Sequence, residues 1–373
     1  MIPVNAPLLD GNERKYLLEC IDSGWISSEG PFVKRFEDAF AARVGRKHGI
    51  AVSSGSAALE AAVAALGIGP GDEVIQPAFT IISCAASVVR AGAIPVLVDA
   101  DPANWNMDPA QIESRVTPRT RAIIVAHTYG LPADMAPILE VARRHGLAVI
   151  EDAAQMHGQD YRGKPCGGFG EMSTFSFYSN KLVATGEGGM VVTDDPALAE
   201  RCRSLRNHCL RPEARFVHEA LGWNFRMTSL QAALGLAQLE RLDDFVGRKR
   251  SMGREYTRLL SGLRGLQLPL EQTDYARSVY WVYGVVLEES VKLDARESMR
   301  RLDSAEIGTR PFFCPMHLQP VFLKMGLFAG ESHPVAENLW RRGFYLPSGL
   351  ALTPEQIAIA AQRLKELLDE LTG

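Results

Sequence analysis

The 373-residue sequence lacks the features that mark three broad classes of protein. No stretch reaches the roughly 18 apolar residues of a membrane helix, and no charged segment followed by an apolar run is visible at the N-terminus, so no secretory signal is expected. Lysine and arginine number 40 against 44 aspartates and glutamates, which gives a net charge of −4 and a pI of about 6.1. Without a basic excess, we expect neither a nucleic-acid partner nor a membrane partner.

Several short motifs are also missing. The six cysteines form no CxxC pair, and the eight histidines show no spacing typical of metal ligands. We therefore expect free thiols, a cytoplasmic location and no metal site. There is no GxxxxGK[ST] P-loop, and no GxGxxG turn follows the early strands, which disfavours a nicotinamide-dependent oxidoreductase.

The overall composition, 46% hydrophobic and 23% charged, is typical of a globular protein, and 373 residues are enough for two domains. From about residue 73 to residue 193, short β-rich runs alternate with helical stretches, which predicts an α/β fold with a mostly parallel sheet. Ligands of such sheets bind beyond the carboxyl ends of the strands. The expected strands cover 73–75, 94–98, 122–126, 148–150, 173–178 and 190–193.

The rest of the chain gives a coarser pattern. Residues 8–66 read as helical with interruptions, and residues 230–262 read as one long helical region. The C-terminal part shows strand-like runs at 280–287 and 307–313 and an amphipathic helix after Thr353. We expect a large domain over residues 1–245 and a small domain over residues 246–373.

Lys181 stands at the end of a predicted strand and is followed by the glycine-rich turn 186–189. Glycines let the backbone approach a ligand closely. Burial at such a place lowers the pKa of a lysine, so that its neutral amine can attack a carbonyl and form a Schiff base. A lone lysine after a strand is more often an ordinary surface residue, so this interpretation depends on the other residues around it.

Asp152 follows Glu151 at the end of the apolar run 148–150. A carboxylate at the carboxyl end of a strand is well placed to keep a cationic ring nitrogen protonated, because an opposite charge at close range favours the charged form. Aspartate is also a favoured N-cap residue. Taken alone, Asp152 is equally consistent with a helix cap.

Small residues at 53–59 precede a helix that is expected to run to about Leu66. Free backbone N–H groups at a helix N-terminus bind anions, and the Ser56 hydroxyl can add another donor. A capped helix start without a ligand remains the alternative.

An anion site, a carboxylate and a strand-end lysine, in this order on an α/β chain, match the phosphate, the ring nitrogen and the aldehyde of pyridoxal phosphate. Here the chain resembles the DegT/DnrJ/EryC1/StrS sugar aminotransferases, and its N-terminus is closest to the perosamine-forming members. The resemblance implies an aspartate aminotransferase (type I) fold, with a large, mostly parallel seven-stranded sheet domain and a smaller C-terminal α/β domain. The matching motifs lie at residues 2–4, 9–16, 24–28, 69–74, 151–154, 180–181, 186–189 and 224–227.

The resemblance implies a role for each matching residue. Lys181 would carry the Schiff base and move protons, Asp152 would pair with the pyridine nitrogen, and Gln155 would bond to the ring hydroxyl. Asn224 would reach the cofactor phosphate of the neighbouring subunit, which implies a homodimer with shared active sites. The phosphate would otherwise be held by small residues of the same chain: Gly55, Ser56, Ala57 and Ser176.

Residues of the sugar site are also implied, with structural alternatives left open. Trp25, Ser27 and Ser28 match a segment that borders the sugar, although composition alone makes Trp25 a core aromatic. His317 resembles a motif near the substrate pocket, and a structural histidine is the alternative. Arg310 and His157 are open in the same way; His157 could line the pocket just past Gln155 or cap a turn.

Three departures from the family pattern concern the cofactor ring and the sugar. Ile81 stands where many members have an aromatic that stacks on the ring. Either Phe79, on the same side of an extended chain, could substitute for it, or an aliphatic surface could suffice. Gln155 stands where perosamine-type enzymes often have glutamate, and Cys314 where many have histidine.

We therefore predict ping-pong transamination from glutamate to a nucleotide-linked 4-keto-6-deoxy sugar, with pyridoxamine phosphate as the intermediate form of the cofactor. GDP-4-keto-6-deoxymannose giving GDP-perosamine is the preferred reaction, in deoxyaminosugar and O-antigen or lipopolysaccharide biosynthesis; another ketosugar is the alternative. Related sugar dehydratases carry histidine in place of the lysine, so Lys181 disfavours them. A non-catalytic sensor on the same scaffold is disfavoured by the intact lysine, aspartate and phosphate cradle.

Overall fold

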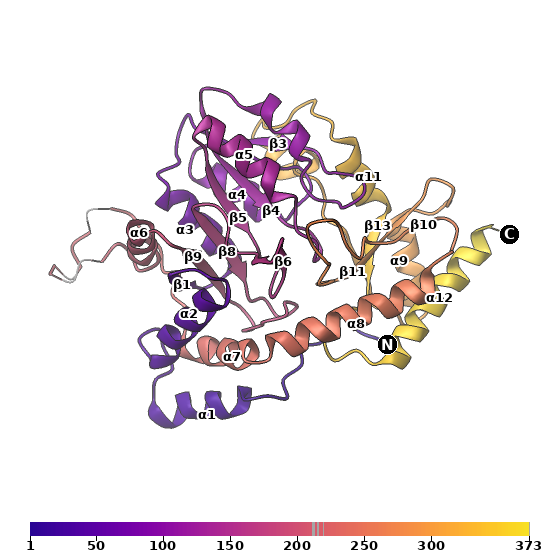
Figure 1. The fold of residues 1–373 in the computed structure, drawn as a ribbon, viewed down its shortest axis with the longest axis horizontal. Helices are drawn as coiled ribbons and strands as arrows, with labels where there is room; N and C mark the ends of the chain where they lie inside the picture. Colours follow the sequence, from indigo (N-terminus) through magenta and orange to yellow (C-terminus); the bar gives the residue numbers. More distant parts are fainter. Residues whose placement is uncertain (211–212, 215, 219, 373) are drawn as a thin grey trace.

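The computed structural model describes residues 1–210, 213–214, 216–218 and 220–372, without the side chains of 370–372 (Figure 1). Its centre is a seven-stranded sheet in the order β1-β9-β8-β5-β4-β2-β3. The strands are β1 (His48–Val52), β2 (Glu73–Pro77), β3 (Ile94–Val98), β4 (Thr120–Ala126), β5 (Ala148–Asp152), β8 (Met172–Ser176) and β9 (Gly189–Thr193).

The sheet is mostly parallel, as predicted. β2 pairs in parallel with β3 and β4, β4 with β5, and β5 with β8. β9 pairs antiparallel with both β1 and β8, so it alone runs in the opposite direction within this sheet. The carboxyl ends of β5 and β8 consequently meet at one edge, where the site is found.

Helices cover both faces of this sheet. Because side chains alternate along a strand, neighbours such as Ile123 and Ile124 of β4 pack into different clusters. This two-sided burial explains the nearly continuous apolar runs of the strands. One face is covered by α3 (Gly55–Ala65), α4 (Ser83–Arg90) and α6 (Pro196–Arg206), and the other by α2 (Pro31–Arg43), α5 (Met135–His145) and α7 (Ser229–Leu239).

A second, four-stranded antiparallel sheet lies toward the C-terminus, in the order β10-β11-β13-β12. Ile2 forms a bridge with Ile307 and packs with the C-terminal cluster, so the N-terminal residues lie with this sheet. The domain boundary near residue 245 stays a prediction and falls inside α8. The elements are α8 (Leu242–Leu260), β10 (Leu266–Gln267), β11 (Tyr283–Leu287), α9 (Ala295–Ser304), β12 (Arg310–Pro311), α11 (Pro334–Arg342), β13 (Gly343–Leu346) and α12 (Pro354–Thr372).

The remaining elements are short or peripheral, and α1 packs beside α7 at one end of the molecule (Figure 1). Among the described residues, no helix combines the length and apolar character needed to cross a membrane. These elements are α1 (Glu13–Ser23), the 3₁₀ turns η1 (Pro109–Gln111), η2 (Glu113–Arg115) and η3 (Met316–Leu318), the hairpin β6 (Asp160–Tyr161) and β7 (Lys164–Pro165), and α10 (Pro320–Lys324).

Three sequence expectations need correction. The helical reading of residues 8–66 missed β1, whose five residues are too short to show a clear period. The helix expected over 230–262 is broken between Leu239 and Leu242, and the strand expected over 307–313 shortens to Arg310–Pro311. Proline cannot donate to a further strand, which fits the position of β12 at the sheet edge.

Lys249 is a buried cation on α8 that joins two chain segments. Its side chain is 2% exposed, and Nζ donates to the carbonyl oxygens of Trp281, at 2.7 Å, and Ser348. Burial lowers the pKa of this amine to about 7. The fold therefore favours the neutral form of Lys249.

This depressed pKa predicts how stability depends on pH. The unfolded chain holds the lysine proton up to about pH 10.4 and the folded chain releases it near pH 7, so stability rises between these values and is lost as the pH falls. One such lysine contributes at most about 1.4 kcal/mol per pH unit. We expect Lys249→Met to show a smaller rise in unfolding free energy from pH 7 to pH 9, measured in urea.

The test compares the slope of the unfolding free energy against pH and not its absolute value, because Lys249→Met also loses stability when two carbonyl groups lose their donor. Lys324, which is exposed, provides the control: Lys324→Met should keep the slope of the parent protein. Equal slopes in Lys249→Met and the parent would contradict the prediction.

Candidate active site

A cavity of about 460 Å³ lies where the carboxyl ends of β5 and β8 face the C-terminal sheet. It is lined by the start of α3, by the segment 176–181 and by residues of the C-terminal part, including Trp281 and Tyr345. This is the expected place for a ligand of a parallel sheet. Eight of the predicted site residues line it: Gly55, Ser56, Ile81, Asp152, Gln155, Ser176, Lys181 and Arg310.

Lys181 reaches this cavity from the loop after β8. Burial lowers the pKa of its amine to about 7, while the nearby carboxylate of Asp152 acts in the opposite direction. Nζ lies 3.6 Å from the centroid of the Trp281 ring. A large share of Lys181 is therefore a neutral nucleophile near pH 7, as the Schiff-base interpretation requires.

Asp152 and Glu151 are adjacent carboxylates that side-chain alternation sends to opposite faces of the sheet. Asp152 faces α4: Oδ1 accepts from the Ala154 N–H at 3.1 Å, and the Cys84 thiol lies 3.4 Å from Oδ2. Burial raises the pKa of Asp152, which is only 5% exposed, and these contacts and Lys181 offset the rise only in part. The site thus holds an incompletely compensated carboxylate, which suits a cationic ring nitrogen.

The N-terminus of α3 forms a small cradle. A side chain on Gly55 would come within 2.7 Å of Ser176 Cβ, so only glycine leaves this space open. The Ser56 and Ser83 hydroxyls lie 2.7 Å apart at the same place. Backbone N–H groups and hydroxyls together match the donors that a phosphate group needs.

Gln155 is held with its amide oxygen turned away from the cavity. Oε1 accepts from the Tyr129 N–H at 2.6 Å, so the side-chain NH₂ group is the part left to donate to a ligand. These groups match the parts of pyridoxal phosphate. The cradle suits its phosphate, the Asp152 carboxylate its ring nitrogen, the Gln155 amide its ring hydroxyl and the Lys181 amine its aldehyde.

Two predicted cofactor residues lie outside the cavity lining. The Ala57 N–H is already bonded to Ser54 Oγ at 3.1 Å, as the N-cap bond of α3. Phe79 is buried among Tyr129, Phe312 and Phe313. The chain bends after β2 instead of staying extended, so Phe79 and Ile81 do not share a side, and only Ile81 reaches the cavity.

Two predicted histidines also lie outside the cavity, in structural contacts. His157 is 2% exposed, packs against Phe40, Phe175 and Phe177, and accepts from the Val183 N–H. Burial lowers its pKa to about 3, so it stays neutral. His317 Nε2 lies 3.0 Å from Glu337 Oε1, in the C-terminal part. The contacts of His157 and His317 therefore match the structural role that the sequence leaves open for each of them.

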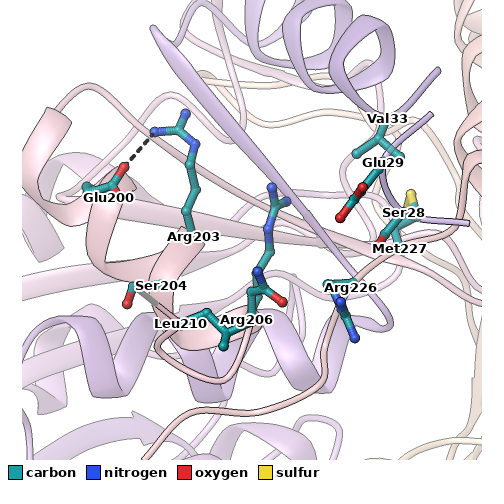
Figure 2. Close-up of a pocket in the computed structure, with 11 residues that line it drawn as sticks. Ser28, Glu29, Val33, Glu200, Arg203, Ser204, Arg206, Leu210, Arg226 and Met227 are labelled. Carbon is teal, nitrogen blue, oxygen red and sulfur yellow. Dashed lines mark ion pairs between the residues drawn. The ribbon is translucent and has the colours of Figure 1, made fainter. Parts of the chain in front are cut away.

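The segments around Trp25 and Asn224 meet at a different place. A second cavity of about 340 Å³ brings Ser28 beside Arg226 and Met227, with Arg203 of α6 on the far side (Figure 2). Ser27 accepts a backbone bond from the Ser229 N–H, and Asn224 is exposed and bonded to Arg226. Trp25 is 49% exposed, so the core-aromatic alternative is wrong.

Sequence reasoning missed Trp281, Tyr345 and Phe313, which line the cavity from the C-terminal part. Trp281 and Tyr345 lie in or beside apolar strands, where each looks like an ordinary core aromatic. Only the pairing of distant segments brings them to Lys181, and no local pattern in the sequence encodes that pairing.

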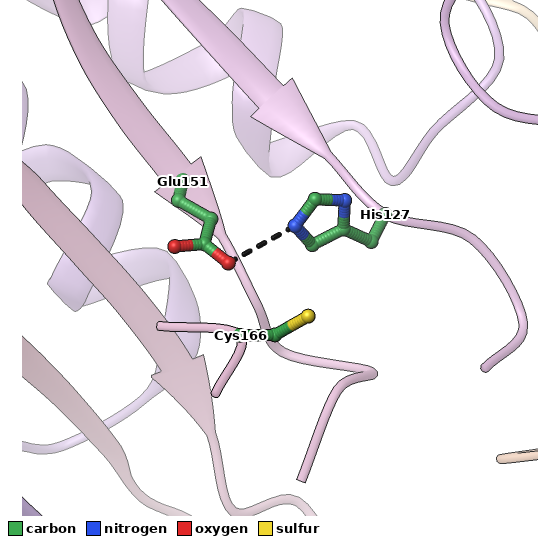
Figure 3. A group of neighbouring side chains, drawn as sticks. All are labelled: His127, Glu151 and Cys166. Atoms are coloured by element: carbon green, nitrogen blue, oxygen red, sulfur yellow. Dashed lines mark hydrogen bonds and ion pairs between the residues drawn. The ribbon is translucent and has the colours of Figure 1, made fainter. Parts of the chain in front are cut away.

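The described residues contain one cluster of metal-ligating types: His127, Glu151 and Cys166 (Figure 3). His127 Nδ1 accepts from the Ala133 N–H, which places the ring proton on Nε2, 3.1 Å from Glu151 Oε1. Glu151 also accepts from the backbone N–H groups of Gly167 and Phe169. Each ring nitrogen of His127 and each carboxylate oxygen of Glu151 thus has a hydrogen-bond partner within the protein, and these contacts account for the two buried residues without a metal ion.

Comparison with known proteins agrees with this geometry. Residues 7–365 match the DegT/DnrJ/EryC1/StrS aminotransferase family. GDP-perosamine synthase of Caulobacter vibrioides is 45% identical over 98% of both chains, and that of Escherichia coli O157:H7 is 40% identical over 99% of both. The structure of Streptomyces venezuelae DesV with a ketimine intermediate is 38% identical, with a TM-score of 0.88 over 96% of this chain and 94% of DesV. The chain therefore belongs to the DegT/DnrJ/EryC1/StrS aminotransferase family and is an enzyme whose cofactor is pyridoxal phosphate, with pyridoxamine phosphate as the form that carries the amino group.

Proposed function

We propose that the protein transfers the amino group of glutamate to GDP-4-keto-6-deoxymannose and so forms GDP-perosamine, for deoxyaminosugar and O-antigen biosynthesis in the cytoplasm. The observation that carries the proposal is the cavity that holds the Lys181 amine, the Asp152 carboxylate and the α3 cradle together. Relatives named GDP-perosamine synthase, which match nearly the whole chain, support the choice of sugar.

In this proposal, each residue holds one part of the cofactor. Gly55, Ser56 and Ser176 bind the phosphate at the N-terminus of α3, and Asp152 keeps the ring nitrogen protonated. Gln155 donates its amide N–H to the ring hydroxyl, and Ile81 gives an aliphatic surface in place of the usual aromatic. When bound, pyridoxal phosphate supplies an aldehyde that bonds to amines and a ring that withdraws electrons.

Lys181 has two tasks in the proposed reaction. It anchors the cofactor and, when its amine is free, the neutral Nζ accepts the proton from the α-carbon of glutamate and passes it on. A pKa of about 7 suits both tasks, since a general base works best when its pKa lies near the working pH.

Arg310 is the cavity residue best suited to an anionic substrate. Its side chain has no hydrogen bond or ion pair within the described part of the chain, and it lines the cavity beside Tyr345. Glutamate carries carboxylates and a nucleotide sugar carries phosphates, and both are ligands that a guanidinium binds with paired N–H donors.

We also propose a homodimer with shared active sites. Asn224 is exposed and lies outside the lining of its own cavity. Apolar side chains are exposed on the same part of the surface, among them Trp25 and Ile26. An exposed apolar surface of this kind suits an interface between subunits.

The first test concerns Lys181 and the sugar together. Purified protein is mixed with glutamate and GDP-, dTDP- and UDP-linked ketosugars, and the products are identified by mass and NMR. We expect an aminated product from GDP-4-keto-6-deoxymannose and a loss of at least about 10³-fold in turnover for Lys181→Ala, since the general base is removed. Full turnover by Lys181→Ala would disprove the mechanism, whereas amination of another ketosugar alone would disprove only the acceptor.

The second test uses the pH dependence of cofactor capture. Below pH 7 the Lys181 amine is protonated and cannot attack an aldehyde, so capture of pyridoxal phosphate by cofactor-free protein should slow by about tenfold per pH unit. Above pH 7 to 8 the rate should level off. An ordinary lysine would instead give a rate that rises up to about pH 10, and this result would contradict the lowered pKa.

The third test asks whether subunits share active sites. Lys181→Ala and Asn224→Ala subunits are each expected to be defective alone. In a mixed dimer, one site combines the intact Lys181 of one subunit with the intact Asn224 of the other, so mixing should restore up to about a quarter of the parent sites. No recovery in dimers shown to have exchanged subunits would contradict the shared site.

A further inference from the structure

Trp281 enters the Lys181 cavity from the opposite part of the fold. It precedes β11, is 4% exposed and lines the cavity. A side chain on Gly130 would come within 2.5 Å of the Trp281 backbone nitrogen, so the two backbones touch. On the other side, Lys249 Nζ donates to the Trp281 carbonyl oxygen at 2.7 Å. The backbone of Trp281 is therefore fixed between two elements.

The indole of Trp281 contacts both the backbone and the amine at the cofactor lysine. Nε1–H donates to the carbonyl oxygen of Asn180, the residue before Lys181, at 2.8 Å. The ring centroid lies 3.6 Å from Lys181 Nζ. Within the described part of the chain, Lys181 Nζ has no hydrogen bond, so the face of this ring is its close partner.

Packing alone does not explain these two contacts. Trp105 is an equally buried tryptophan, 3% exposed, that packs against Tyr129 and Phe312. Its Nε1 has no hydrogen-bond partner, so it behaves as a core aromatic. Trp281, by contrast, donates its indole N–H to Asn180 and presents its ring face to Lys181, which are adjacent residues of one loop. A residue that orients this loop would make such contacts.

We propose that Trp281 is a positioning residue for Lys181: its indole N–H fixes the loop at Asn180, and its ring face receives the Lys181 amine whenever that amine is not bonded to the cofactor. The inference rests on the proposed role of Lys181 as the cofactor lysine. The ring face attracts the protonated amine as a cation, and it is apolar enough to contact the neutral amine as well. It can therefore hold Nζ in the cavity in both protonation states. A lysine held in this way loses less freedom when it reacts.

The test separates the position of the amine from the integrity of the cofactor site. Trp281→Leu removes the ring face and the N–H donor, whereas Trp281→Phe keeps a ring face and removes the donor. In cofactor-free protein, the rate of pyridoxal phosphate capture reports on the amine, and the dissociation constant of pyridoxamine phosphate reports on the cradle without any bond to Lys181.

We expect Trp281→Leu to capture pyridoxal phosphate about tenfold more slowly and Trp281→Phe about threefold more slowly, with pyridoxamine phosphate affinity within about twofold of the parent. In the loaded enzyme, the limiting rate of the glutamate half-reaction should fall while the half-saturating glutamate concentration stays the same. Trp105→Phe is the control, because it changes a core tryptophan that does not contact Lys181. Any fold-loss in its capture rate should be no larger than its fold-loss in pyridoxamine phosphate affinity.

Two results would overturn the role of Trp281 alone: parent-like capture by Trp281→Leu, or an equal loss of capture rate and pyridoxamine phosphate affinity, which would show a structural defect. Capture of pyridoxal phosphate by Lys181→Ala at the parent rate would overturn the assignment of Lys181 itself, and with it this inference.

Discussion

The candidate active site buries an amine and a carboxylate at one edge of a sheet without a close ion pair between them. Lys181 and Asp152 influence each other's charge, yet burial dominates both, lowering the pKa of the lysine and raising that of the aspartate. In water the lysine amine would be fully protonated at neutral pH and could not attack a carbonyl. The helices that cover both faces of the seven-stranded sheet provide the low-dielectric surroundings, so the fold itself shifts the pKa values of the two residues to which we assign the chemistry.

Because side chains alternate along β5, its two adjacent carboxylates, Glu151 and Asp152, face opposite sides of the sheet and make different contacts. Asp152 faces the cavity, while Glu151 faces the other side and binds the backbone N–H groups of Gly167 and Phe169. That second network supports the segment that leads into β8 and so, indirectly, the loop that carries Lys181. A one-residue slip of this strand would exchange the two carboxylates, so the register of β5 determines whether a cofactor site exists at all.

The sequence predicted the features that depend on local patterns. The alternation of strands and helices predicts the mostly parallel sheet, and the order of an anion site, Asp152 and Lys181 along the chain, together with the family resemblance, predicts a cofactor site that none of the three indicates alone. It did not predict where Phe79 points, because the chain bends after Pro77, and it did not predict β1, which is too short to show a period. Trp281 was beyond reach for a different reason: its place beside Lys181 depends on contacts between segments a hundred residues apart. Without a resemblance to known proteins, no residue pattern would have suggested a role for Asn224.

The close approach of Gly130 to Trp281 has a consequence for engineering this enzyme. Chimeras that exchange C-terminal segments between relatives, in order to change the accepted sugar, would also exchange the indole that touches Lys181. A transplanted segment with a different residue at that place could keep the backbone contacts with Gly130 and Lys249, but it would lose the indole N–H bonded to Asn180 and the ring face at Lys181. An exchange of C-terminal segments that is meant to change the accepted sugar therefore leaves the surroundings of Lys181 unchanged only when it keeps tryptophan at position 281.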